Sequence, residues 1–318
     1  MSGTILLKRT PGLDVSLVAA ASGRTVIEMD TVTRQACQDR GVDPDAVEAV
    51  LNASPRDEIA LFPALRWIHA GTAGVDGWFE AGGVPTGVRL TSAVGNGAIP
   101  LAEHALMLML MLSRQATRWL AAQQRHEWDR FVHGELSGAT LGIVGYGHSG
   151  RDLARKARAC HMRVQALRHT PSSARDGDIR LLFGPSGLHE LLATSDFVVV
   201  TAPLTRGSRH LIGARELATM RSSAFLIVVS RGGIVDEGAL IVALREGGIA
   251  GAGLDAHQDE PLPEESPFWD LPNVIVTPHN GATTPETAER GREIVLDNLT
   301  RWVENRPLRN VVDIGRGY

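Results

Sequence analysis

A glycine-rich loop between a strand and a helix restricts the fold of this 318-residue chain more than any other feature. The apolar segment 141–144 runs directly into G-Y-G-H-S-G, which is followed by the helix-forming run RDLARKARA. In this G-x-G-x-x-G pattern the first glycine permits a tight turn, the second lets the backbone approach a pyrophosphate, and the third lets the helix pack on the sheet. Amides at the start of the helix then face the anion. The loop predicts a dinucleotide site at Gly145, Gly147, His148, Ser149 and Gly150.

Further short apolar runs follow the loop at regular intervals, separated by helical or turn-rich segments. They are residues 164–167, 197–200, 225–229 and 274–276. Fully apolar strands of this length, spaced by crossovers, indicate a doubly wound parallel sheet covered on both faces. We therefore expect an α/β fold whose larger domain, 97–283, binds the dinucleotide.

The N-terminal part has a shorter and more mixed pattern. We expect a strand at 4–7, a helix near 44–51, and a strand at 65–69 that ends in a glycine-rich turn. Alternating strands and helices indicate a second, smaller Rossmann-like α/β domain. We assign 1–96 to it, together with 284–318, which contains the helical pattern 286–302.

The apolar segment 101–121, LAEHALMLMLMLSRQATRWLA, predicts one helix that is apolar on nearly all sides. Such a helix is buried either in the core of its own chain or against a second subunit, and periodicity does not distinguish the two. Its breadth makes a homodimer through helix 101–121 the expected assembly.

Charge and cysteine content exclude several classes of protein. Lys and Arg total 32 against 36 Asp and Glu, giving a net charge of −4 with no block of like charge, so nothing favours a nucleic-acid or membrane-surface partner. Cys37 and Cys160 suggest neither a disulfide framework nor a metal site, and they fit a reducing compartment. The longest strictly apolar stretch, 105–112, is far below the roughly 20 residues that span a bilayer. Since the N-terminus also lacks the order of a signal peptide, we expect a cytoplasmic protein.

The end of the second strand of the dinucleotide domain bears on cofactor choice. An acidic residue there would bind the ribose hydroxyls of NAD, but this chain has Arg168, His169 and Thr170. A guanidinium can hold a 2′-phosphate bidentately, so the sequence favours NADP, with NAD still open. The alternative is that Arg168 stacks on the adenine or faces solvent.

Taken together, these segments resemble the D-isomer-specific 2-hydroxyacid dehydrogenase family over nearly the whole chain. The matching segments are AGVD (73–76), PLAEHALMLML (100–110), LGIVGYGHSG (141–150), SDFVVVTAPLT (195–205), SRGGIVDEGAL (230–240), GAGLDAHQDEPLP (251–263) and LPNVIVTPHNGAT (271–283). The resemblance implies a cleft between a substrate domain and the dinucleotide domain. It also implies hydride transfer between NAD(P)H and a small 2-oxo acid, such as glyoxylate or hydroxypyruvate.

The resemblance assigns the chemistry to Arg231, Glu260 and His279. Reduction of a 2-oxo acid needs a hydride donor, a proton for the carbonyl oxygen, and a cation that holds the carboxylate and polarises the carbonyl. Nicotinamide, His279 and Arg231 suit these roles, and Glu260 would orient and stabilise the imidazolium. Taken singly, the three are also compatible with a turn residue, a solvated loop carboxylate and a strand-end cap.

Other positions follow from the same resemblance. The turn at Ala73, Gly74 and Val75 would hold the substrate carboxylate through backbone amides, with Asn96 nearby, although both are also ordinary turn sequences. Asp255 would bind the nicotinamide carboxamide. The remaining cofactor contacts would come from His169, Ala202, Pro203, Val229, Ser230 and Gly281.

Three positions depart from the family pattern and leave the substrate open. Thr201 stands where a His is common, Val228 replaces an Asn, and His257 replaces an aromatic residue. Glu260 argues against a formate dehydrogenase, which pairs the active His with Gln. A phosphite dehydrogenase and a non-enzymatic, dinucleotide-sensing corepressor remain the alternatives.

Overall fold

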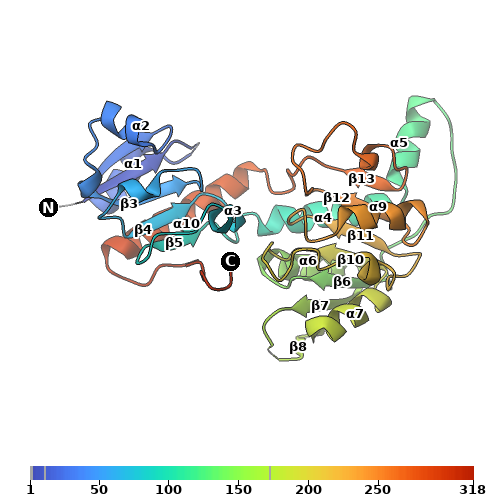
Figure 1. The fold of residues 1–318 in the computed structure, drawn as a ribbon. Coiled ribbons are helices and arrows are strands. Elements are labelled where there is room, and N and C mark those ends of the chain that lie inside the picture. Colours follow the sequence, from blue (N-terminus) through green and yellow to red (C-terminus); the bar gives the residue numbers. More distant parts are fainter. Residues whose placement is uncertain (1–2, 11, 172) are drawn as a thin grey trace. The chain divides into compact units, whose positions relative to one another are not determined.

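The computed structural model describes residues 3–10, 12–171 and 173–318 and divides the chain into two compact units (Figure 1). Unit 1 consists of Met1–Gly97 and Thr283–Tyr318, and unit 2 is Ala98–Ala282. Each unit is built on its own mostly parallel sheet with helices packed against it. The α/β fold with two Rossmann-like units is therefore confirmed.

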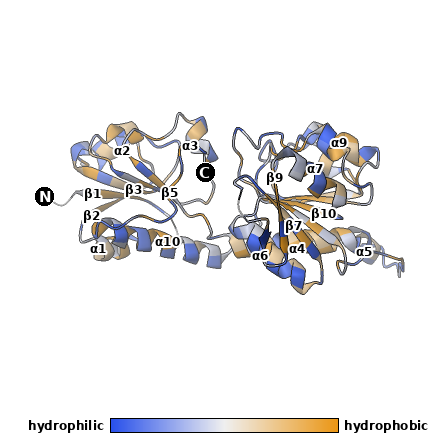
Figure 2. Cartoon of the chain, turned by 90° about the horizontal axis from the view of Figure 1, so that it is seen from below, coloured by the Kyte–Doolittle hydropathy of each residue, from blue (hydrophilic) through white to orange (hydrophobic). Residues whose placement is uncertain are grey.

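Unit 1 contains a parallel sheet with the strand order β2-β1-β3-β4-β5 in the described residues. Its strands are β1 (Thr4–Lys8), β2 (Thr25–Met29), β3 (Val47–Ala53), β4 (Trp67–Ala70) and β5 (Arg89–Ser92). Figure 2 shows α1 (Val15–Ser22) and α10 (Pro285–Val303) on one face of this sheet, and α2 (Arg34–Asp39) and α3 (Asp76–Glu80) on the other. Short 3₁₀ turns occur at Pro44–Ala46 and Ile59–Leu61.

The expected helix near 44–51 is wrong. Only Pro44–Ala46 forms a helical turn, and Val47–Ala53 is a strand that pairs with β1 and β4. A short run of buried apolar residues has no clear period, so a strand between two parallel neighbours cannot be told from a helix by pattern alone. The partner strands decided the conformation.

Unit 2 contains a larger sheet with the strand order β13-β12-β11-β10-β6-β7-β9-β8 in the described residues. Its strands are β6 (Thr140–Val144), β7 (Arg163–Arg168), β8 (Arg175–Asp176), β9 (Ile179–Phe183), β10 (Phe197–Val200), β11 (Phe225–Val228), β12 (Gly251–Leu254) and β13 (Val274–Val276). All the pairings are parallel except that of β8 with β9. β6 has β7 on one side and β10 on the other, so the chain reverses its direction across the sheet at β6.

Two apolar layers cover the faces of this sheet. One contains residues of α4 (Ala98–Ser113) and α6 (His148–Ala159), and the other contains residues of α7 (Gly184–Thr194), α8 (Ala214–Leu217) and α9 (Glu237–Arg245). The strands are accordingly orange in Figure 2, with helices on both sides. Burial of apolar side chains on both faces supplies most of the free energy that favours this fold.

The single helix expected over 101–121 is also wrong. α4 ends at Ser113, and α5 (Ala116–Gln124) starts after Gln115, whose φ of 50° is left-handed. A non-glycine residue in this conformation is uncommon, and neither Gly nor Pro marks the break in the sequence. Among the described residues, no helix has both the length and the apolar character needed to cross a membrane.

A buried histidine lies in the sheet of unit 1. His69 of β4 is 1% exposed, and its Nδ1 is 2.9 Å from Thr91 Oγ1, which also accepts a hydrogen bond from Trp67 Nε1. Burial opposes the charged imidazolium and lowers the pKa of His69 from 6.5 to about 4. The ring is therefore neutral in the folded protein at neutral pH.

We predict that His69 makes the protein lose stability on acidification. The unfolded chain takes up this proton near pH 6.5 and the folded chain only near pH 4, so the loss begins below 6.5 and is complete below 4. Between pH 7 and 4.5, the free energy of unfolding lost through His69 should be roughly 2–3 kcal/mol. Urea unfolding of the parent and of His69→Gln at both pH values measures it. A difference between the two proteins that stays constant with pH would contradict the assignment.

Candidate active site

The predicted site residues of unit 2 follow the carboxyl ends of its parallel strands. β6 leads into the glycine loop, and β10, β11, β12 and β13 lead into the segments that begin at Thr201, Val229, Asp255 and Thr277. Since these strands run in the same direction, their carboxyl ends lie along one edge of the sheet. The order of the strands reverses between β6 and β10, and open α/β sheets bind ligands beside the carboxyl ends of the strands at such a point.

Two glycines of the loop are required by the chain itself. Gly145 has a φ of 102°, and a Cβ there would lie 2.4 Å from the backbone nitrogen of Ala202. A Cβ on Gly150 would lie 2.4 Å from Gly145 O, so only glycine lets α6 pack this closely. These contacts hold the loop tightly against the strand ends.

Gly147 differs, because a Cβ there would meet no described atom within 4 Å. It is also the N-cap of α6, and no side chain of the described residues caps that helix end. The amides of the first turn, on His148, Ser149 and Gly150, are thus left for an external acceptor. An open backbone approach beside an uncapped helix N-terminus fits the pyrophosphate of a dinucleotide.

The end of β7 carries the residues predicted to select the cofactor. Arg168 is half-buried and His169 is exposed. Sequence reasoning missed a neighbouring acid, Asp176 of β8, whose Oδ2 accepts a hydrogen bond of 3.2 Å from Tyr146 Oη. Burial raises the pKa of Tyr146, and the charge and hydrogen bond of Asp176 raise it further. The hairpin of β8 and β9 that supplies this acid was not predicted.

Glu260 and His279 form a close pair. Nδ1 of His279 lies 2.9 Å from Oε1 and 2.8 Å from Oε2 of Glu260, and both side chains are 36% exposed. Burial raises the pKa of Glu260, but hydrogen bonds from His257 N and His279, with the charge of both rings, outweigh this and hold it below its usual range. With Nδ1 facing the carboxylate, Nε2 of His279 is the nitrogen left for another group.

The backbone around His279 is strained and firmly held. His279 has a φ of 49°. Both oxygens of Asp255, which is 0% exposed, accept hydrogen bonds from the same segment: Oδ1 from Asn280 N and Oδ2 from Gly281 N. Asp255 Oδ1 also accepts from Thr277 Oγ1 at 2.7 Å and lies 3.4 Å from Nε2 of His104. The left-handed conformation is thus fixed by a buried carboxylate.

His104 and Thr277 belong to this network and were not singled out from the sequence. His104 Nε2 lies 3.0 Å from Thr277 Oγ1, which connects α4 to the segment after β13. Both residues lie in segments that match the family pattern, but the two are 173 positions apart in sequence, so their contact leaves no local signal.

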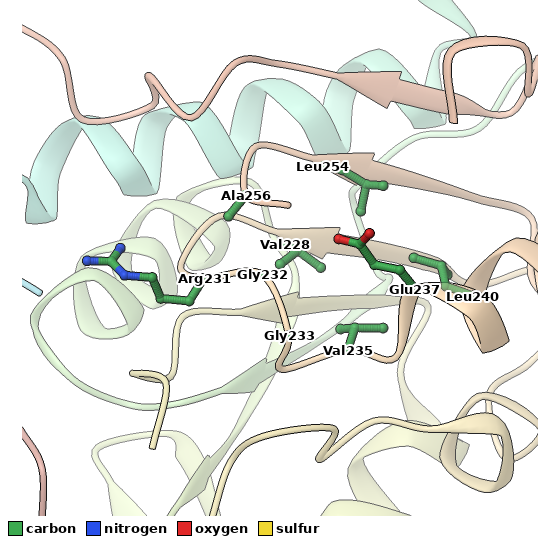
Figure 3. Close-up of a pocket in the computed structure, with 9 residues that line it drawn as sticks. All are labelled: Val228, Arg231, Gly232, Gly233, Val235, Glu237, Leu240, Leu254 and Ala256. Carbon is green, nitrogen blue, oxygen red and sulfur yellow. The ribbon is translucent and has the colours of Figure 1, made fainter. Parts of the chain in front are cut away.

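Arg231 follows β11 at the same edge of the sheet. Its Nη1 donates a 2.7 Å hydrogen bond to Ser230 O. Figure 3 shows its guanidinium pointing away from a small, mostly apolar pocket, whereas the carboxyl group of Glu237 points between Val228 and Leu254. Burial raises the pKa of Glu237, and its Oε1 accepts a hydrogen bond from Gln258 N. Arg231 is therefore directed away from this pocket.

The residues predicted to bind substrate through backbone amides and a side-chain amide belong to unit 1. Thr72 Oγ1 donates to Gly74 O at 2.8 Å, which closes the turn around Ala73, Gly74 and Val75. Asn96 is buried, its Oδ1 accepts from Gly97 N, and its carbonyl accepts from Arg290 Nε at 2.6 Å. Both segments are ordered by contacts within their own unit.

Comparison with known proteins identifies the class to which this fold and site belong. Residues 106–281 match the family described as D-isomer specific 2-hydroxyacid dehydrogenase, NAD binding domain. Glyoxylate reductase of Pyrococcus furiosus is 33% identical over 278 residues, which are 84% of this chain and 82% of that enzyme. An NADPH-dependent glyoxylate/hydroxypyruvate reductase from Sinorhizobium meliloti, solved with NADP and sulfate, has a TM-score of 0.83 at 29% identity, with all of both chains covered.

The chain is thus a nicotinamide-dinucleotide-dependent oxidoreductase. It belongs to the D-isomer specific 2-hydroxyacid dehydrogenase family. It is also 33% identical to D-3-phosphoglycerate dehydrogenase of Methanocaldococcus jannaschii over 263 residues, and this match spans about half the length of that enzyme, 49%.

Proposed function

We propose that this protein reduces a small 2-oxo acid, glyoxylate or hydroxypyruvate, to the corresponding 2-hydroxy acid, as the D isomer where the product is chiral, with NADPH as the preferred cofactor. The contact between His279 and Glu260, at the sheet edge that also carries the dinucleotide loop, is the observation that supports it most directly. The choice of glyoxylate and hydroxypyruvate is supported by the similar proteins, which include a glyoxylate reductase and a glyoxylate/hydroxypyruvate reductase.

Three side chains would act on the substrate beside the dinucleotide. When bound, the dinucleotide would supply a hydride for the carbonyl carbon. Nε2 of His279 gives its proton to the carbonyl oxygen, and Glu260 stabilises the imidazolium through Nδ1. The guanidinium of Arg231 contacts the carboxylate and the ketone oxygen together, because its planar fork presents parallel donors. The products are the hydroxy acid and the oxidised dinucleotide.

Other residues would bind the dinucleotide or the substrate without taking part in proton transfer. In unit 2, which we take as the dinucleotide-binding domain, the loop at Gly145–Gly150 would hold the pyrophosphate and the strand ends would line the cofactor. These strand-end residues are Ala202, Pro203, Val229, Ser230, Asp255 and Gly281. In unit 1, the proposed substrate domain, amides of Ala73, Gly74 and Val75 would hold the substrate carboxylate, with Asn96 beside them.

An assay of purified protein against a panel of 2-oxo acids tests the function. We expect glyoxylate or hydroxypyruvate to oxidise NADPH, measured as loss of absorbance, faster than pyruvate, phenylpyruvate or branched oxo acids do. The reverse assays with phosphite and formate belong to the panel. Turnover of phosphite alone, or cofactor binding with no turnover of any acid, would contradict the proposal.

Arg168 is the proposed partner of the 2′-phosphate. It stands at the end of β7, where an acidic residue would favour NAD. Arg168→Asp removes a cation and adds repulsion, so we expect it to lower or reverse the ratio of kcat/KM for NADPH to kcat/KM for NADH. Arg163→Asp, at the other end of the same strand, is the matched control. Equal efficiency with both cofactors in the parent would remove the basis for this assignment.

The pair of Glu260 and His279 predicts a distinct pH dependence. Reduction needs protonated His279, so its rate should fall as pH rises. Glu260→Gln removes the negative charge that stabilises the imidazolium while keeping a hydrogen-bonding group, so this fall should move to more acidic pH. His279→Ala should lower kcat by about 10²-fold or more. A reductive pH profile that does not move in Glu260→Gln would show that the pair is wrongly assigned.

A homodimer and a cytoplasmic location complete the proposal. α4 and α5 expose apolar side chains beside their buried face, namely Ile99, Met107, Leu110, Trp119 and Leu120. A surface of this kind favours burial against a second copy. Light scattering at micromolar concentration should report a mass twice that of the 34.1 kDa chain, and the mass of a monomer would refute the dimer.

The proposed location rests on the cysteines. Two free cysteines, Cys37 and Cys160, fit the reducing cytoplasm.

A further inference from the structure

His257 contacts each of the segments that carry the three proposed reactive residues. Its backbone N–H donates to Glu260 Oε1 at 2.9 Å, and its ring Nε2 lies 3.3 Å from Thr277 O, two residues before His279. Its carbonyl group packs so closely on Gly232, the residue after Arg231, that a Cβ there would lie 2.0 Å from it. No residue type other than glycine can therefore stand at 232 without moving His257.

The ring of His257 is buried, and only one of its two nitrogens has a hydrogen-bond partner among the described residues. The residue is 5% exposed and its ring packs near Phe268, with ring centroids 6.5 Å apart. Since Thr277 O is an acceptor, Nε2 must carry the proton and donate. Nδ1 has no hydrogen-bond partner among the described residues. An apolar aromatic ring of similar size would avoid the cost of this orphaned nitrogen.

The one hydrogen bond of this ring acts on the backbone of His279. Thr277 O also accepts from His279 N at 3.1 Å, so the same carbonyl receives both donors. His279 is held at a φ of 49°, a conformation that persists only when neighbouring contacts fix it. Asp255 fixes the segment from the side of Asn280 and Gly281, and His257 fixes it from the side of Thr277.

We propose that His257 is a positioning residue that holds His279 against Glu260, through its ring on Thr277 and its amide on Glu260. This inference rests on the proposed function for its effect on rate, but the geometry of the pair is independent of the substrate. The ring itself has carboxylates among its electrostatic neighbours, Glu237 and Glu260, so a test must separate its charge from its hydrogen bond.

Two substitutions separate the charge of the His257 ring from its hydrogen bond. His257→Phe keeps an aromatic ring but removes both the donor and the titratable group, whereas His257→Gln keeps an N–H donor and removes only the titratable group. We expect His257→Phe to fold with an equal or higher Tm and to bind NADPH with an unchanged Kd. Its kcat should fall about fivefold, the effect of one lost hydrogen bond on a positioned group, and His257→Gln should recover most of that loss.

A second measurement does not depend on turnover. The ring resonances of His279, assigned by their absence in His279→Ala, are titrated by NMR in the parent and in both variants. Looser contact with Glu260 should move the titration midpoint of His279 to lower pH in His257→Phe, with recovery in His257→Gln. The proposal is overturned if the midpoint is the same in all three proteins, or if both variants behave alike while Tm and cofactor Kd are retained. If the midpoint moves but no acid is reduced, His257 keeps its role and the proposed function fails.

Discussion

Parallel pairing around β6 is the constraint on which the candidate site depends. β6 lies between β7 and β10, and both neighbours run in its direction. This arrangement gathers the carboxyl ends of strands that are far apart in sequence along one edge, where backbone amides and short loops meet. The glycine loop, Arg231, Asp255 and His279 are all first or early residues after these strands, so the direction of the strands brings them to the same edge of the sheet. Contacts between the loops then fix their geometry.

The close packing at this edge explains why so many of its positions tolerate only one residue type. Gly145 touches the backbone of Ala202, Gly232 touches His257, and a Cβ on Gly281 would lie 2.7 Å from Asp255 Oδ2. Each of these contacts joins the loop after one strand to the loop after another. The loops therefore form one packed layer, in which a shift of any one backbone would displace the next.

Asp255 shows how a buried charge is used in this layer. An unpaired carboxylate with no solvent exposure would be costly, but Asp255 receives donors from Thr277, Asn280 and Gly281. These bonds fix the backbone on which His279 is strained, while the side chains of His279 and Glu260 stay partly exposed. The rigid part of the site is thus buried, and the groups able to exchange protons face outward.

The sequence by itself determined the α/β class, the strand that precedes the glycine loop and the family, and it predicts Arg231, Glu260 and His279 as the reactive residues. These follow from local signals, because glycine spacing, short apolar runs and family motifs all lie within a few residues of each other. Only the tertiary structure decided that Val47–Ala53 is a strand, that the long apolar helix breaks at Gln115, and that Tyr146 meets Asp176. It alone revealed the contacts of His104 and His257 with the segment before His279. There are two physical reasons. A short buried apolar run has the same pattern in a strand as in a helix, so only its pairing with neighbouring strands distinguishes them. A hydrogen bond between residues distant in sequence leaves no pattern in either local segment.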